Sequence, residues 1–191
     1  MGKEVERAKI AVSKALEGHN VVMVSSGDPG VYGMAGIVLE VAAQEKTPLP
    51  VEIVPGVTAA TAAASKLGAP LVSDFAVISL SDLLTPWEKI ERRLEAAASA
   101  DFSIVLYNPK SEGRIEPLMK AYEIMLKHIR PETPVGIVKQ AGRKGEQVIV
   151  TTLKELLNVE IDMVTTIVVG NSATKVVKGK MVTARGYDLI G

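Results

Sequence analysis

Residues 25–33, which read Ser-Ser-Gly-Asp-Pro-Gly-Val-Tyr-Gly, are the part of the chain best suited to bind a ligand. Their three glycines let a ligand come close to the backbone, because glycine has no Cβ. Asp28 adds a carboxylate acceptor. Apolar residues precede the segment at 21–24, and an apolar helical pattern follows at 34–43. This order predicts a strand, a tight turn and a helix, which in open α/β sheets places ligands at the carboxyl ends of strands. An ordinary strand-to-helix connection would show the same pattern.

Further turns follow extended apolar segments in the same way. They are Pro55-Gly56-Val57-Thr58-Ala59, Tyr107-Asn108-Pro109 and Lys139-Gln140-Ala141-Gly142-Arg143, and a fifth turn, Val169-Gly170-Asn171-Ser172, ends the last main strand. Pro-Gly and Asn-Pro pairs are common in turns, so each is a weak signal alone. Because the first four turns each end an expected strand, we expect them at one edge of the sheet, around a common ligand.

The elements that position these turns alternate along nearly the whole chain. Helices are expected at 5–18, 34–44, 59–67, 86–98, 115–129 and 153–157, and strands at 21–24, 51–54, 75–80, 102–107, 135–139, 147–151, 165–170 and 181–184. This alternation is typical of the α/β class. Residues 68–74 read as a linker, so we expect two α/β lobes, 1–70 and 71–191, with a cleft between them.

Composition excludes several classes of protein. The 191 residues are 47% hydrophobic, with 22 basic and 22 acidic side chains, which predicts no attraction to nucleic acid or membrane. There is no cysteine, which excludes disulfides and thiol catalysis, and the two histidines lie far apart, so we expect no metal site. No apolar run approaches the roughly 20 residues of a membrane span. The start, Met1-Gly2-Lys3-Glu4, lacks the apolar core of a signal peptide, which predicts a cytoplasmic protein.

Together and in this order, the turns resemble the tetrapyrrole methylase family over essentially the whole chain. Residues 27–33 and 106–111, with Val138-Lys139-Gln140-Ala141-Gly142-Arg143, are most similar to the branch that methylates carbon 17 in cobalamin biosynthesis. That branch contains the precorrin-3B C(17)-methyltransferases and their anaerobic cobalt-factor III counterparts. The resemblance implies S-adenosylmethionine as cofactor, a tetrapyrrole substrate, methylation of carbon 17 with ring contraction, and a homodimer.

The resemblance also implies roles for individual residues. The cofactor-binding positions would be Ser26, Gly27, Asp28, Val31, Thr58, Ala59, Tyr107, Asn108, Ala141 and Gly142. The substrate carries many carboxylates, and cations close to the turns are suited to bind them, namely Lys110, Arg114 and Arg143. A single surface cation is also compatible with simple exposure to solvent.

Methyl transfer from a sulfonium requires alignment of donor and acceptor more than side-chain chemistry, so no catalytic triad is expected. Ring contraction needs a proton to move, and Asp28 and Tyr107 are the nearest titratable candidates. Asp28 could instead cap its turn by accepting backbone N–H bonds, and Tyr107 could simply pack on the sheet. The catalytic residues therefore stay unassigned.

One departure from the family pattern is visible. Family members begin with a strand that ends in a glycine-proline-glycine turn, and this sequence opens directly on the helix before 21–24. We therefore expect an incomplete N-terminal lobe with an exposed sheet edge or a gap, association into a dimer or larger species, and little activity. An N-terminal extension that restores the strand should repair both defects.

Two alternatives stay open. The chain could belong to another branch of the family, such as diphthine synthase or a ribosomal RNA ribose methyltransferase, although zero net charge argues against an RNA-directed enzyme. It could also be a non-catalytic binding protein or partner subunit, which the missing first strand favours.

Overall fold

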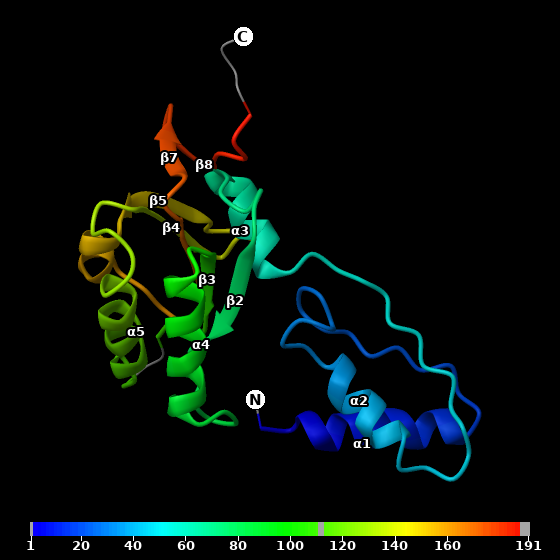
Figure 1. Ribbon diagram of the computed structural model, residues 1–191. Coiled ribbons are helices and arrows are strands. Elements are labelled where there is room, and N and C mark those ends of the chain that lie inside the picture. The colour runs from blue at the N-terminus through cyan, green and yellow to red at the C-terminus, as the bar shows by residue number, and fades with distance from the viewer. Residues whose placement is uncertain (1, 111–112, 188–191) are drawn as a thin grey trace. The chain divides into compact units, whose positions relative to one another are not determined.

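The computed structural model describes residues 2–110 and 113–187 (Figure 1). The chain forms two compact units, Met1–Thr58 (unit 1) and Ala59–Gly191 (unit 2). The boundary between two lobes that the sequence predicts at residue 70 stays a prediction.

Unit 1 is built on two helices, α1 (Glu4–Leu16) and α2 (Ala35–Ala42), which pack together. Ala8 and Val12 are four residues apart on one face of α1, and they form a small buried cluster with Val41 of α2. Acidic residues in the first turn of α1 and Lys14 in its last turn suit the helix dipole. Both helices were predicted from the apolar spacing.

The prediction of two strands in unit 1, at 21–24 and 51–54, is wrong. These residues carry neither helix nor strand, and neither of the two sheets in the described residues includes them. A strand is stabilised by a hydrogen-bonded neighbour, and both sheets lie in unit 2. Valines 22 and 24 are consequently 84% and 85% exposed.

Unit 2 contains a five-stranded mixed sheet in the order β2-β3-β6-β4-β5. The strands are β2 (Phe75–Ser79), β3 (Ser103–Tyr107), β4 (Pro134–Lys139), β5 (Gln147–Thr152) and β6 (Thr165–Val169). Strands β2 and β3 are parallel, whereas β6 is antiparallel to both β3 and β4, and β4 to β5. All five were predicted within a residue or two, and the α/β class is confirmed.

Helices cover both faces of this sheet. Figure 1 shows α4 (Trp87–Ser99) and α5 (Glu116–Leu126) side by side on one face, where a 3₁₀ helix, η1 (Leu153–Asn158), joins the same core. The other face packs on α3 (Ala59–Leu67). Side chains alternate between the faces: Ile104 and Leu106 contact the α4–α5 layer, and Val105 contacts α3.

A second, three-stranded sheet has the order β1-β8-β7, from β1 (Gly68–Ala69), β8 (Lys180–Thr183) and β7 (Thr174–Val177). Only β8 was predicted. Residues 68–74 were expected to be a linker, but the first two of them form β1, which pairs in parallel with β8. This pairing joins parts of the chain more than 100 residues apart, so local patterns did not predict it. The Thr183 hydroxyl, which donates to the Pro70 carbonyl oxygen at 2.8 Å, adds to this junction.

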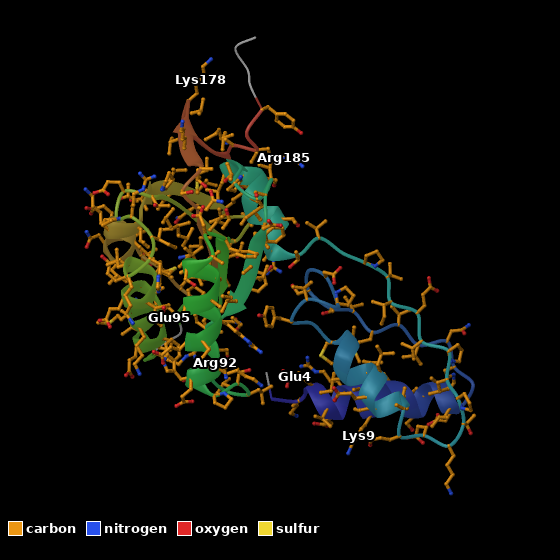
Figure 2. The ribbon with its side chains drawn as sticks, in the orientation of Figure 1. Glu4, Lys9, Arg92, Glu95, Lys178 and Arg185 are labelled. Carbon is orange, nitrogen blue, oxygen red and sulfur yellow. The ribbon has the colours of Figure 1, made fainter. Side chains whose placement is uncertain are left out.

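The charged residues labelled in Figure 2 lie on several elements: α1, α4, the β7–β8 turn and the segment after β8. Glu95 of α4 accepts hydrogen bonds from Lys127 and His128, directly after α5. The His128 and Lys127 side chains lower the pKa of Glu95, in that order of effect. These contacts link α4 to the end of α5 and belong to the surface of the helical layer.

Candidate functional site

Three strand ends meet at one edge of the five-stranded sheet. Strand β3 ends at Tyr107 and β4 at Lys139, whereas β6 begins at Thr165, which pairs with Lys139. Because β6 runs antiparallel to both neighbours, its first residues lie at the edge where the other two strands end. The sheet therefore brings two of the predicted turns together with a strand start that carried no turn motif.

A pocket of about 240 Å³ lies at this edge. It is lined by Ala59, Tyr107, Asn108, Gln140, Ala141, Arg143, Met163, Val164, Thr165 and Thr166. Four of the positions expected at the cofactor, and Arg143 expected at the substrate, are thus gathered around one cavity. The residues from Met163 to Thr166 were missed, because only the antiparallel pairing of β6 places them here.

Both strands that end at the pocket are followed by a residue in the left-handed region. Asn108 has φ +51° and Gln140 has φ +52°. Asparagine tolerates this conformation, whereas for glutamine it is uncommon and costs energy that neighbouring contacts must offset. The Gln140 N–H donates to the Val164 carbonyl oxygen at 3.0 Å, and the Asn108 side-chain amide donates to Ser79 Oγ at 2.9 Å. These bonds hold the two bends that open the pocket.

The turn after β4 is closed by Glu146, which sequence reasoning missed. Its carboxylate accepts the Gly142 N–H at 2.6 Å and lies 3.3 Å from Lys66 Nζ of α3. The Gly142 hydrogen bond is the main cause of the lowered pKa of Glu146, and Lys66 adds to it. Gly142, expected at the cofactor, is outside the pocket lining and serves to close this turn.

The loop before β6 is held by Asp162. Its Oδ1 accepts the Val164 N–H at 3.0 Å and the Thr165 hydroxyl at 2.7 Å, and its Oδ2 lies 2.6 Å from Lys139 Nζ. Partial burial acts to raise the pKa of Asp162, but the hydrogen bonds from Lys139, Thr165 and Val164 outweigh it, so the pKa is lowered. One carboxylate therefore fixes two pocket residues relative to the end of β4.

In unit 1, Asp28 connects two of the predicted turns. Its Oδ1 accepts the Gly30 N–H at 2.8 Å and its Oδ2 accepts the Gly56 N–H at 2.9 Å. The backbones at Gly27 and Gly56 touch, since a Cβ added at Gly56 would overlap the Gly27 carbonyl oxygen. Gly27 itself has φ +74°. The geometry supports the structural role of Asp28, as a cap that joins the two turns.

The remaining cofactor candidates of unit 1 lie on these turns. The Val31 N–H donates to the Asp28 carbonyl oxygen at 3.2 Å, and the Val31 side chain is half-buried. Ser26 is exposed beside Gly27, and Thr58 ends the unit next to Val57. The structure therefore gathers the unit 1 candidates in one turn pair, and their contact with a cofactor stays a prediction.

Acid should weaken the turn pair through Asp28. Its pKa is lowered mainly by the Gly56 N–H and then by the Gly30 N–H. A group with a lowered folded pKa stabilises fully above its unfolded value of about 3.9 and loses that contribution as pH falls through the folded value. Asp28→Asn should therefore be less stable than wild type at pH 6, and the difference in free energy of unfolding should shrink between pH 4 and pH 2.5. Urea unfolding at each pH measures it; a difference that is independent of pH would contradict the assignment.

The three substrate candidates have different surroundings. Arg114 donates to Asp82 Oδ1 at 2.6 Å and to the Leu80 carbonyl oxygen at 3.3 Å, so it also anchors the loop after β2. Arg143 is exposed at the pocket. Lys110 is half-buried and directly precedes Ser111, which lies outside the described residues. Arg143 is the candidate that the pocket geometry favours.

The fifth predicted turn lies away from the pocket. Residues 170–172 follow β6, whose antiparallel direction puts its end beside the start of β3, at the opposite edge of the sheet. There Asp101 accepts hydrogen bonds from the Ser172 N–H at 2.9 Å and from the Ser172 hydroxyl at 2.5 Å. This turn therefore stabilises the far edge.

Within residues 2–110 and 113–187, no group of three or more histidine, cysteine, aspartate or glutamate side chains could hold a metal ion. None of the helices in that part of the chain combines the length and the apolar character needed to cross a membrane.

Comparison with known proteins shows clear relatives. The chain is 50% identical over 189 residues to the probable cobalt-factor III C(17)-methyltransferase of Salmonella typhimurium, covering 99% of this chain and 78% of that protein. It is 51% identical over 192 residues to the cobalt-factor III methyltransferase of Priestia megaterium, covering 98% of this chain and 36% of the relative. The crystal structure of the methyltransferase CobJ matches with a TM-score of 0.88 and 36% identity, covering 95% of this chain and 77% of the other.

A family model agrees with these relatives. The model of the tetrapyrrole (corrin/porphyrin) methylases matches residues 2–157, which is most of the chain. The enzymes of this family transfer methyl groups from S-adenosylmethionine. The resemblance carried by the glycine-rich and strand-ending turns is thereby confirmed, and the chain belongs to the tetrapyrrole methylase family.

Proposed function

We propose that this protein methylates carbon 17 of a tetrapyrrole, cobalt-factor III or its metal-free counterpart precorrin-3B, with contraction of the ring. The relatives that share half of its residues and are named for the C(17) reaction support this substrate over those of diphthine synthase or the ribose methyltransferases. The single observation that carries the proposal is the pocket at the ends of β3 and β4, where Ala59, Tyr107, Asn108 and Ala141 converge.

The pocket residues fit the cofactor. The small side chains of Ala59 and Ala141 leave space for a flat base and its sugar. Met163 adds an apolar surface, and Thr165 and Thr166 add hydroxyl groups. S-adenosylmethionine supplies a methyl group on a positively charged sulfur that is already activated for transfer. The chain's own part is to hold the acceptor carbon in line with that methyl group and to exclude water.

The rigid bends serve this alignment. Gln140 and Asn108 turn the chain sharply at the two strand ends, while Asp162 and Glu146 hold the loops on either side. Backbone groups fixed by such bonds need no rearrangement during the reaction. Asp28 accepts hydrogen bonds from two backbone N–H groups, which is the structural role of a cap. The residue that carries the proton during ring contraction therefore stays unassigned.

Arg143 would bind a carboxylate of the macrocycle at the mouth of the pocket. It is exposed, and it lies within the turn that the Gly142–Glu146 hydrogen bond closes. Guanidinium groups suit carboxylates because two parallel N–H bonds can form. Arg114 and Lys110 are further candidates, and we propose a role for Arg114 in placing the loop that contains Asp82.

We propose a cytoplasmic homodimer without a nucleic-acid partner. Formal net charge of zero supports the absence of a nucleic-acid partner, because phosphate binding depends on clustered cations. Exposed valines in unit 1 support self-association.

The test combines activity with one substitution. Purified chain with S-adenosylmethionine and cobalt-factor III or precorrin-3B should give a product heavier by one methyl group, measured by mass spectrometry. Arg143→Ala should weaken tetrapyrrole binding by about 1.5–3 kcal/mol, the range of a charged hydrogen bond, and leave S-adenosylhomocysteine affinity unchanged.

Lys144→Ala is the matched control, since Lys144 is exposed next to Arg143 and outside the pocket lining. It should change neither affinity. If Arg143→Ala lowers cofactor affinity and spares the tetrapyrrole, the two sites are reversed. Binding of both ligands without any product would support the alternative of a non-catalytic binding protein.

A further inference from the structure

The first turn of α3 is held by a residue far away in the sequence. The first N–H groups of a helix have no carbonyl partner within the helix, so they bond to groups outside it. Here the Ala60 N–H donates to the hydroxyl oxygen of Tyr107, with 2.6 Å between nitrogen and oxygen. The two residues are 47 positions apart, so the hydrogen bond joins the start of a helix to the end of a strand.

Tyr107 is itself firmly placed. It is the last residue of β3 and pairs with Ser79 of β2, and its carbonyl oxygen accepts the Leu80 N–H at 2.9 Å. Its ring packs on the cluster between α3 and the sheet that contains Ala60 and Val105. The hydroxyl thus links the beginning of α3 to β3, a strand inside the sheet.

Both sides of this bond border the pocket. Tyr107 lines it directly, and Ala59, the residue before the bonded N–H, lines it from α3. The separation between helix start and strand end therefore sets the width of the cavity on that side. We propose that Tyr107 is a positioning residue, whose hydroxyl holds the start of α3 at the spacing that the cofactor requires. The identity of the ligand in this inference rests on the proposed function.

Two roles of the Tyr107 hydroxyl would have different consequences. As a proton carrier, Tyr107 would govern the rate and its pH dependence. As a positioning residue, it would govern cofactor affinity, and a phenylalanine would keep the packing of the ring while losing the acceptor for the Ala60 N–H. That N–H would then lack its partner in the first turn of α3.

Tyr107→Phe should raise the Kd for S-adenosylhomocysteine roughly three- to tenfold, the effect of one ordinary hydrogen bond. The kcat at saturating cofactor should fall by a smaller factor than the Kd rises, and its pH profile should keep both limbs. Tyr122→Phe is the matched control, because its hydroxyl donates to the Lys154 carbonyl oxygen at 3.4 Å from α5, away from the pocket. Titration calorimetry should find wild-type affinity in that variant. An unchanged Kd in Tyr107→Phe, or a lost limb of the pH profile, would overturn the positioning role.

Hydrogen exchange tests the contact without any ligand. In Tyr107→Phe the Ala60 amide should exchange faster, whereas the amides of Ala63 and Ala64, inside α3, should keep their protection. If the Ala60 amide exchanges faster in Tyr107→Phe than in wild type, but wild type itself does not bind S-adenosylhomocysteine, the proposed function is refuted and the helix contact is supported. Unchanged exchange together with unchanged affinity would refute the inference alone.

Discussion

Gly56→Ala should separate the two turns of unit 1 and abolish their contribution to cofactor binding. A Cβ at this position would overlap the Gly27 carbonyl oxygen and lie 3.1 Å from its carbonyl carbon. These neighbours are backbone atoms, so they can yield only by moving the turn, and the Gly56 hydrogen bond to Asp28 would be strained as well. Overpacking of this kind costs about 1–3 kcal/mol. We expect unit 1 to lose stability by that amount and S-adenosylhomocysteine affinity to fall at least tenfold.

The matched control is Gly36→Ala, the same substitution in the same unit. Gly36 lies in α2, where a Cβ would have no atom within 4 Å, and alanine is favoured over glycine inside a helix. Stability should stay equal or rise by about 0.5–1 kcal/mol, with unchanged affinity. Urea unfolding and calorimetry measure both variants. Equal behaviour of Gly56→Ala and Gly36→Ala would show that the contact between the turns has no role in binding.

The second large effect concerns association of the protein. Residues 21–23 and 51–54 line a hollow of about 420 Å³ in unit 1, together with apolar side chains of α1 and α2. Both segments have the apolar composition of strands, and neither joins a sheet of the described residues. Unpaired extended chain with exposed valines favours pairing with another chain. We therefore expect dimers or larger species whose proportion rises with concentration.

Val22→Lys combined with Val24→Lys should reduce this association at least tenfold, because two charges per chain would have to be desolvated on pairing. Val5→Lys with Ile10→Lys adds the same charges to α1, where the two side chains are 51% and 56% exposed and the helix satisfies its own backbone. That control should associate like wild type. Light scattering over a range of concentrations measures all three proteins. A wild-type monomer at every concentration, or equal effects of both pairs, would refute pairing through 21–24.

Much of unit 2 could be predicted from local patterns. Its strands are short apolar runs bounded by turn residues, and such runs form strands wherever helices cover both faces of a sheet. For example, Ile104 and Leu106 lie on one face of the sheet and Val105 on the other, and all three are buried. The start of α4 at Trp87 follows from Pro86, since proline fixes a backbone angle compatible with a helix start.

Other features needed long-range pairing. The runs at 21–24 and 51–54 are rich in valine, as most strands of unit 2 are, yet they join no sheet of the described residues. Strands β1 and β7 were not recognised from sequence, and both pair with β8, which lies between them. Glu146 and Asp162 became recognisable only from their hydrogen bonds, since an isolated acidic residue in a loop reads as solvated.

The sequence by itself determined the α/β class, the family and the turns that concern the cofactor. Glycine and proline impose local backbone geometry, so the turns can be recognised from residue types. Their order along the chain is that of the family pattern. Only the tertiary structure decided which of those turns meet. The antiparallel direction of β6 brought residues 163–166 to the pocket and sent residues 170–172 to the opposite edge. Strand direction depends on hydrogen bonds between segments distant in sequence, and no local pattern of residue types encodes it.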